Sequence, residues 1–206
     1  MEQEVQHDRG NPAEEKDSRS KKAKNEIVEW LKAIVIALVL VILIRWLLFK
    51  PFVVDGPSMQ PNFETGERVI VNEILYDIRE PKRGEVIVFH VPSEGRDFIK
   101  RVIAVEGDTV EVQDDTVMVN GKKVDETYIQ GAIDAAEANG GTYNVKDFPN
   151  EQFPDGKVPA GHVFVMGDNR PNSTDSRMIG YVSLKDIIGR ADVIFWPIGE
   201  IKWINH

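Results

Sequence analysis

The 206-residue sequence predicts a mainly β domain carried by one N-terminal membrane helix. Short apolar or alternating runs recur beyond residue 50, separated by Gly, Pro and Asp, which is typical of antiparallel strands joined by turns. Helical periodicity is nearly absent there, apart from a short stretch at 132–138. A single long apolar stretch near the N-terminus supplies the helix.

Residues 1–26 are polar, mix both charge signs and offer little besides Val5 to bury. A segment with so little apolar surface does not fold on its own. We therefore expect this segment to be a disordered tail.

Residues 27–49 predict a transmembrane helix. The run from Ala33 to Ile44 is uninterruptedly apolar, and the flanking residues extend it to roughly 20, enough to cross a bilayer. Trp30 and Trp46 lie near its two ends, where aromatic side chains favour the membrane interface. A buried core helix and a cleaved signal peptide are the alternatives. The absence of a polar stripe argues against the first, and that of a small-x-small site against the second.

The distribution of basic residues predicts the orientation of this helix. Before the helix stands the cluster Arg19, Lys21, Lys22 and Lys24. After it, Lys50 alone lies close. By the positive-inside rule the tail is cytoplasmic, and residues 50–206 form an extracytoplasmic domain.

Strands are expected within that domain at 68–72, 85–91, 98–106, 109–113, 116–119, 162–166 and 190–196. Asp114-Asp115 and Asn120-Gly121 are typical of hairpin turns. Residues 130–159 are rich in Gly, Asn, Asp and Pro, which indicates a loop-rich excursion from the main sheet.

Composition excludes several classes of function. The formal net charge of −9 falls in residues 50–206, because the small charges of the tail and the helix cancel. A domain this acidic repels phosphate, which argues against nucleic-acid binding. The chain has no cysteine, so thiol nucleophiles, disulfides and thiolate metal sites are excluded.

The histidines do not indicate a metal site or a Ser-His-Asp triad. They are scattered along the chain, and no HExxH motif is present, so we expect no metal. His90 and His162 stand inside strand-like runs, where a structural histidine is the commoner explanation.

Two polar segments beside strands could carry chemistry. Residues 55–61 place Ser58 after a glycine and between two prolines, which restricts the direction of its hydroxyl. Residues 167–177 form a dense run of Asp, Asn, Arg and Ser directly after a strand. The alternatives are an ordinary turn with a solvated serine and a polar loop held by its own turns and ion pairs.

A serine nucleophile without histidine needs another base, and a neutral lysine amine can serve. Lys100 stands in a mostly apolar run, where burial would lower its pKa toward neutrality. The negative charge of the domain acts in the opposite direction and would raise the pKa of Lys100. The alternative is a strand lysine that points to solvent.

These segments, together with 66–71 and 100–108, occur in the order found in the type I signal peptidases of bacteria, which the chain resembles over residues 27–197. The single helix and the short excursion are similar to the compact Gram-positive form. The resemblance implies a β-sheet or barrel catalytic domain, no cofactor, and a Ser/Lys dyad that cleaves signal peptides from exported preproteins after Ala-x-Ala-like sites through an acyl-enzyme.

Residue roles follow from the same resemblance. Ser58 would be the nucleophile and Lys100 the general base, and Ser173 would hydrogen-bond the Lys100 amine. Asp175 would pair with Arg177 to brace the loop. The implied further supporting residues are Asp168, Asn169 and Arg170. The implied substrate-pocket residues are Phe52, Val54, Met59 and Ile99, for which core packing is the alternative.

The oxyanion hole is where this chain departs from some relatives. The Ser58 backbone N–H would be one donor. Some members carry a hydroxyl residue two positions before the nucleophile as a second donor, whereas this chain has Gly56, which leaves the second donor open.

The resemblance also implies location and partners. The enzyme would be a single-pass protein of the bacterial cytoplasmic membrane, with its catalytic domain on the outer face. Its partners would be exported preproteins, the lipid bilayer and the secretion translocon. Two other hypotheses remain open: a self-cleaving Ser/Lys protease of the repressor type, and a catalytically silent anchored scaffold. The membrane helix argues against the first, and the presence of Ser58, Lys100 and Ser173 argues against the second.

Overall fold

The computed structural model of the chain describes residues 27–42 and 49–206. The chain divides into two compact units, Met1–Leu47 and Leu48–His206. Residues 27–42 are helical and their side chains are exposed. In these two ranges no helix combines the length and the apolar character needed to cross a membrane. The predicted tail and the end of the predicted transmembrane helix lie outside the described residues.

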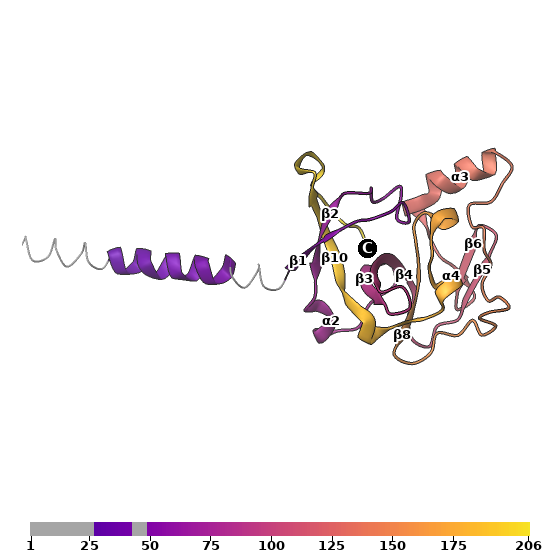
Figure 1. The fold of residues 1–206 in the computed structure, drawn as a ribbon, viewed down its shortest axis with the longest axis horizontal. Coiled ribbons are helices and arrows are strands. Elements are labelled where there is room, and N and C mark those ends of the chain that lie inside the picture. Colours follow the sequence, from indigo (N-terminus) through magenta and orange to yellow (C-terminus); the bar gives the residue numbers. More distant parts are fainter. Residues whose placement is uncertain (1–26, 43–48) are drawn as a thin grey trace, which may run out of the picture. The chain divides into compact units, whose positions relative to one another are not determined.

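Antiparallel strands dominate the second unit (Figure 1). The strands are β1 (Phe49–Val53), β2 (Arg68–Asn72), β3 (Val86–Val91), β4 (Arg96–Ala104), β5 (Val110–Gln113), β6 (Thr116–Val119), β7 (Lys122–Lys123), β8 (His162–Met166), β9 (Val182–Ser183), β10 (Ile187–Trp196) and β11 (Lys202–Trp203). The helices are α2 (Leu75–Ile78), α3 (Gln130–Ala138) and α4 (Ser176–Ile179), with 3-10 turns η1 (Thr127–Ile129), η2 (Arg170–Asn172), η3 (Leu184–Asp186) and η4 (Ile198–Glu200). The mainly β prediction is therefore confirmed.

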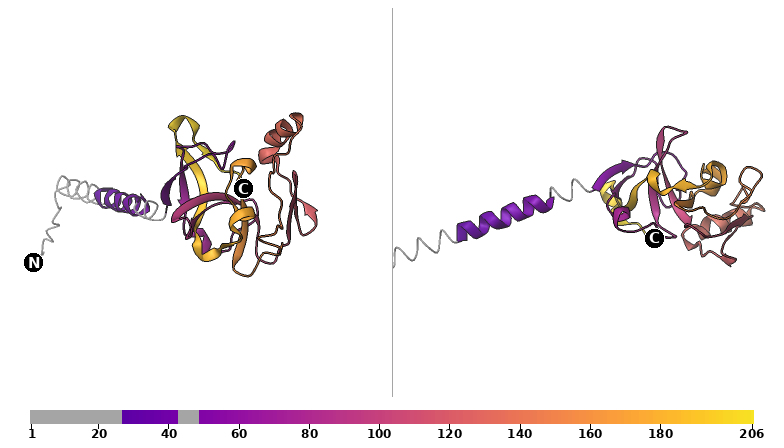
Figure 2. Two further views of the ribbon diagram at one scale, coloured as in Figure 1. Left: turned by 45° about the vertical axis from the view of Figure 1, so that its right-hand side comes forward. Right: turned by 90° about the horizontal axis from the view of Figure 1, so that it is seen from below.

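The main sheet has the strand order β1-β2-β10-β3-β4-β8-β9, with β11 added to β10. The sheet is open, because its two end strands, β1 and β9, do not pair with each other in the described part of the chain. The closed barrel that the sequence analysis allowed is therefore not formed. A second sheet, β5-β6-β7, lies with α3 on the side of the domain away from β1 and β2 (Figures 1 and 2).

Most predicted strands form close to their expected positions. The largest differences are at β4, which runs from Arg96 to Ala104 rather than from 98 to 106, and at β10, which begins at Ile187 rather than 190. Both extensions follow from pairing with β3, through Arg96–Val91 and Ile187–Phe89. β1 was not predicted, because its first residue continues the apolar run assigned to the membrane helix. The two-residue strands β7, β9 and β11 were not predicted either, because they are too short to show a pattern.

The two hairpin turns of the small sheet form as predicted. Asp114 and Asn120 adopt positive φ angles of 47° and 55°, and Gly121 adopts 71°. Asn and Asp tolerate this left-handed region better than other non-glycine residues, and glycine has no steric penalty there. In the excursion 130–159, the short helical stretch expected at 132–138 forms as α3, which begins two residues earlier, at Gln130.

Strands β3 and β4 form the buried centre of the domain. Successive residues of β3 enter different apolar clusters: Val86 and Val88 join one, and Ile87 and Phe89 join another. A third cluster attaches the small sheet to β8, with the rings of Phe148 and Phe164 only 4.4 Å apart. A side chain in the middle of β4 is therefore enclosed by apolar packing.

Glu85, just before β3, is the centre of a buried ionic network. Its carboxylate accepts hydrogen bonds from the guanidinium groups of Arg79 and Arg190 and from the Lys82 backbone N–H, 2.8 Å away. Burial alone would raise the pKa of this carboxyl, but these hydrogen bonds outweigh burial and lower the pKa to about 2.

This network predicts acid sensitivity. A carboxyl whose folded-state pKa lies below its ordinary value of 4.5 contributes stability at higher pH that is lost as the pH falls toward 2. We expect Glu85→Gln to lower the free energy of unfolding at pH 7 and to flatten its dependence on pH between about 4.5 and 2. Urea titrations across this range measure both effects. Exposed Glu111→Gln is the control, and an acid dependence that is as steep in Glu85→Gln as in wild type would contradict the prediction.

Candidate active site

Ser58 lies in a loop between β1 and β2 that is closed at its base. The Val54 N–H donates to Glu67 O and the Gly66 N–H donates to Val54 O, both at 2.9 Å. Met59, next to the serine, is fully buried and anchors the loop in the core. Gly56 allows the tight entry into the loop, because its φ of 90° is unfavourable for a residue with a Cβ. The loop thus holds Ser58 half-buried in a defined position.

Lys100 lies in the middle of β4, opposite Ile87 of β3, and its side chain is almost completely buried. Its Nζ is 2.7 Å from Ser58 Oγ and donates to Ile99 O at 2.8 Å. Burial, which disfavours the ammonium form, lowers the Lys100 pKa from 10.5 to about 8, although the Asp175 and Asp168 carboxylates act to raise it. A minor but usable fraction of the amine is therefore neutral near pH 7, and about half of it at pH 8, so it can accept a proton.

Asn169 connects the serine loop to the loop that follows β8. Its backbone N–H donates to Ser58 O and its side-chain amide to Pro57 O, both at 3.0 Å. The two loops are separated by more than a hundred residues, yet these bonds fix the backbone on either side of the nucleophile. Gly167 lies in the same contact, since a Cβ there would overlap Ser58 O and Ser173 Oγ.

Three buried arginines form hydrogen bonds that hold the loop after β8 in place. Arg101 makes a two-bond fork to Asp168, at 2.7 and 2.9 Å. Arg177 makes a similar fork to Asp175, at 2.8 and 2.9 Å. Such paired charge-assisted hydrogen bonds hold both position and angle. The third arginine, Arg170, donates from Nε to Gly167 O at 3.0 Å.

A serine hydroxyl 2.7 Å from a buried amine can act as a nucleophile with an adjacent base. The two histidines considered for a triad are engaged elsewhere: His90 Nδ1 lies 2.8 Å from Asp97 Oδ1, and His162 Nδ1 lies 2.8 Å from Ala160 O. In the part of the chain that the structure describes, no three metal-ligating side chains gather. The arrangement therefore suits acyl transfer by serine and lysine.

Comparison with known proteins gives the family. The family described as signal peptidase, peptidase S26, matches residues 27–196. The chain belongs to this family. A signal peptidase I of Bacillus licheniformis is 41% identical over 187 residues, covering 90% of this chain and 97% of the relative. A signal peptidase IB of Staphylococcus aureus is 39% identical over 182 residues, covering 87% and 95%.

A solved structure supports the same assignment. The crystal structure of a signal peptidase I from Enterococcus faecalis V583 matches with 37% sequence identity and a TM-score of 0.50, covering 54% of this chain and 97% of that one. Membership of the S26 family makes this chain a serine peptidase, and its mainly β domain is similar to that of a signal peptidase I.

Ser173 does not take its expected place in this S26 peptidase. Its Oγ is buried and has no hydrogen-bond partner among the described residues, so the expected bond to the Lys100 amine is absent. The amine donates to Ile99 O instead. Ser173 nevertheless lies beside the serine loop, because its Oγ and Ser58 O both occupy the space that a Cβ on Gly167 would need.

The four expected pocket residues gather in one apolar cluster beneath the serine loop. Val54, Met59 and Ile99 are buried there, and Phe52 packs against them while partly exposed. The structure thus brings the four together, with Phe52 alone reaching the surface. Val54, Met59 and Ile99 are packed in the core, as the alternative interpretation expected.

Sequence reasoning missed Glu126 and Tyr128 in this S26 peptidase. The guanidinium of Arg170 is fully buried, forms an ion pair with Glu126 and donates to Tyr128 Oη at 2.9 Å. The Tyr128 ring also stacks on Arg101, whose Cζ is 4.1 Å from the ring centroid. A buried arginine requires a carboxylate partner, but nothing local in the sequence identifies which of the 34 acidic residues supplies it.

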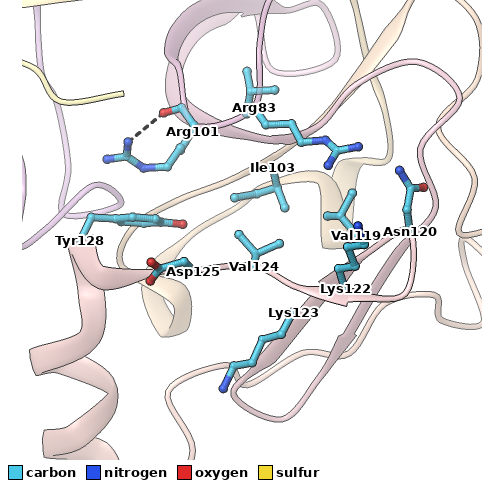
Figure 3. Close-up of a pocket in the computed structure, with 12 residues that line it drawn as sticks. Arg83, Arg101, Ile103, Val119, Asn120, Lys122, Lys123, Val124, Asp125 and Tyr128 are labelled. Atoms are coloured by element: carbon cyan, nitrogen blue, oxygen red, sulfur yellow. Dashed lines mark hydrogen bonds between the residues drawn. The ribbon is translucent and has the colours of Figure 1, made fainter.

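A cavity of about 410 Å³ opens behind this network. Figure 3 shows the Arg101 guanidinium above the Tyr128 ring at one end, and Arg83 and Asn120 at the other. Arg101 therefore both binds Asp168 and lines the cavity.

Proposed function

We propose that this S26 member is a membrane-anchored signal peptidase that cleaves signal peptides from exported preproteins with Ser58 as nucleophile and Lys100 as general base. The 2.7 Å approach of the buried Lys100 Nζ to Ser58 Oγ is the single observation that carries the proposal. The names of the relatives, signal peptidase I and IB, supply the substrate class.

In this mechanism the neutral Lys100 amine takes the Ser58 hydroxyl proton as Oγ attacks the scissile carbonyl. The Ser58 N–H, near the attacked carbonyl, serves as one donor to the oxyanion. The Lys100 ammonium then gives its proton to the leaving amine, which releases the mature protein and leaves an acyl-enzyme. A water molecule, deprotonated by the same amine, hydrolyses the ester and frees the signal peptide.

Small residues before the cleavage site fit the apolar floor beside the serine. Val54, Met59 and Ile99 are buried and Phe52 packs against them partly exposed, so the substrate would meet a shallow apolar surface rather than a deep pocket. A shallow apolar site accepts Ala and excludes bulky side chains. We therefore assign these four residues to substrate binding at Ala-x-Ala-like sites.

Anchoring follows the sequence: residues 1–26 form a cytoplasmic tail, 27–49 a transmembrane helix, and 50–206 the catalytic domain outside the membrane. Exposed apolar side chains at one end of the main sheet support a membrane-facing surface. They are Val53, Trp196, Ile198, Ile201 and Trp203. Trp and aliphatic side chains of this kind favour the lipid interface. The bilayer and the secretion translocon are the proposed neighbours.

The proposed base predicts the pH dependence of cleavage. Because Lys100 acts as the neutral amine, kcat/KM for a preprotein with an Ala-x-Ala site should rise with pH along an acid limb whose midpoint is near 8. Gel assays of the purified full-length protein in detergent, at constant ionic strength from pH 6 to 10, measure it. The same preprotein with Trp in place of the last Ala is the control and should stay uncleaved. Cleavage that is independent of pH over this range would refute a lysine base.

A further inference from the structure

Strand β4 places Arg96, Phe98 and Lys100 on one face, because side chains two residues apart in a strand point the same way. The Phe98 ring lies between the two cations: Arg96 Cζ and Lys100 Nζ are each 5.0 Å from its centroid. The face of an aromatic ring attracts positive charge over this distance. One ring therefore contacts both the proposed base and a second cation.

The three side chains differ in their exposure to solvent. Lys100 and Phe98 are buried, whereas the Arg96 side chain is 64% exposed. The Phe98 ring is further held by an edge-to-face contact with Phe89, at 6.1 Å between centroids. The Phe98 ring is thus held in place and contacts both the buried amine and a cation at the surface.

The charged groups around Lys100 leave Arg96 as the main cation acting on it. The carboxylates of Asp168 and Asp175 favour the ammonium form, but each is held in a fork by its own arginine. Arg96 acts in the opposite direction, and its partner Glu94, 3.1 Å away, is itself exposed.

The remaining titratable groups on the neighbouring strands are engaged elsewhere. On β3, His90 pairs with Asp97, which points to the face opposite Lys100 by strand alternation. On β8, the imidazole of His162 is bound to Ala160 O. The balance at the Lys100 amine is therefore set by two buried carboxylates and one surface guanidinium.

We propose that Arg96 is a positioning residue for the reaction: stacked on the Phe98 ring that it shares with Lys100, it keeps the Lys100 amine neutral and directed at Ser58. This inference rests on the proposed function, in which Lys100 is the base. The physical reason is that an aromatic ring already polarised by one cation stabilises a second cation less, and that like charges repel. Arg96 is outside the segments that carry the family resemblance.

The test compares acid limbs of kcat/KM for full-length variants at low ionic strength. Arg96→Gln should move the midpoint to higher pH by roughly 0.3–0.5 unit, as expected for a partly exposed charge. Glu94→Gln should move it to lower pH, because it removes the carboxylate that neutralises Arg96. Arg96→Lys keeps the charge and should restore the wild-type midpoint. Lys122→Gln, which removes a cation from β7 of the other sheet, is the control for net charge and should cause no shift.

A double-variant cycle tests the role of the ring. Phe98→Leu keeps most of the buried volume but removes the stacking surface, so Arg96→Gln should shift the midpoint much less in that background. An equal shift in both backgrounds would show that the ring has no part. The shift should also diminish in 1 M salt, where exposed charges are screened.

The possible failures are distinguishable. A wild-type profile without an acid limb would overturn the proposed function, and this inference with it. A normal wild-type limb that Arg96→Gln leaves in place, or one that moves equally in Lys122→Gln, would overturn the inference alone.

Discussion

Arginine in place of Lys100 is expected to lower kcat/KM for preprotein cleavage by roughly 10³-fold or more. The substitution keeps the positive charge but removes the ability to accept a proton, because a guanidinium stays protonated at every working pH. Ser58→Ala should be at least as inactive, since it removes the attacking oxygen. Because the two groups act as a unit, the double variant should be hardly worse than either single one.

A stability measurement separates loss of chemistry from loss of fold. Lys100→Met replaces a buried amine by an apolar chain of similar length, so it should match or exceed the wild-type melting temperature while staying inactive. Lys122→Arg, at an exposed position, is the matched control and should retain full activity. Substantial cleavage by Lys100→Arg would exclude a neutral-amine base.

Gly167→Ala should reduce kcat/KM by roughly 10²-fold or more, because a displacement near 1 Å in a reacting group costs about that much. The added methyl group would overlap the Ser58 carbonyl and the Ser173 hydroxyl. The first of these is main chain, so the serine loop itself must move. The hydrogen bond from the Asn169 N–H to Ser58 O would lengthen with it.

Gly131→Ala is the matched control. It lies in α3, where a Cβ would meet no described atom within 4 Å, and alanine there should stabilise the helix slightly. Kinetics are compared with thermal denaturation for both variants. A folded Gly167→Ala enzyme with wild-type kcat/KM would show that the position of Ser58 does not depend on this contact.

The sequence allowed the fold class to be predicted because its signals are local. Short apolar runs marked β6 and β8 to the residue, and Asn120-Gly121 marked a hairpin turn. Ends such as Arg96 of β4 depended on pairing with β3, which no local pattern records. β1 was hidden because an apolar run looks the same in a membrane helix and in a strand.

The site was predictable where its chemistry is unusual and unpredictable where it depends on long-range geometry. A lysine within an apolar run is rare, which drew attention to Lys100, and the structure does place its amine beside Ser58. The choice of Glu126 as partner of Arg170 is set by tertiary packing across 44 residues of chain. The Ser173 hydroxyl, which has no hydrogen-bond partner among the described residues, likewise reflects a loop conformation that residue types do not specify.

The place of β10 in the main sheet has a consequence for biogenesis. This strand is among the last to emerge during synthesis, yet it pairs with both β2 and β3, which follow the nucleophile and precede the base. Until it inserts, the two halves of the sheet share no ladder, and closing such a long-range contact late is costly in chain entropy. The peptidase would therefore become competent only after nearly the whole domain has been synthesised.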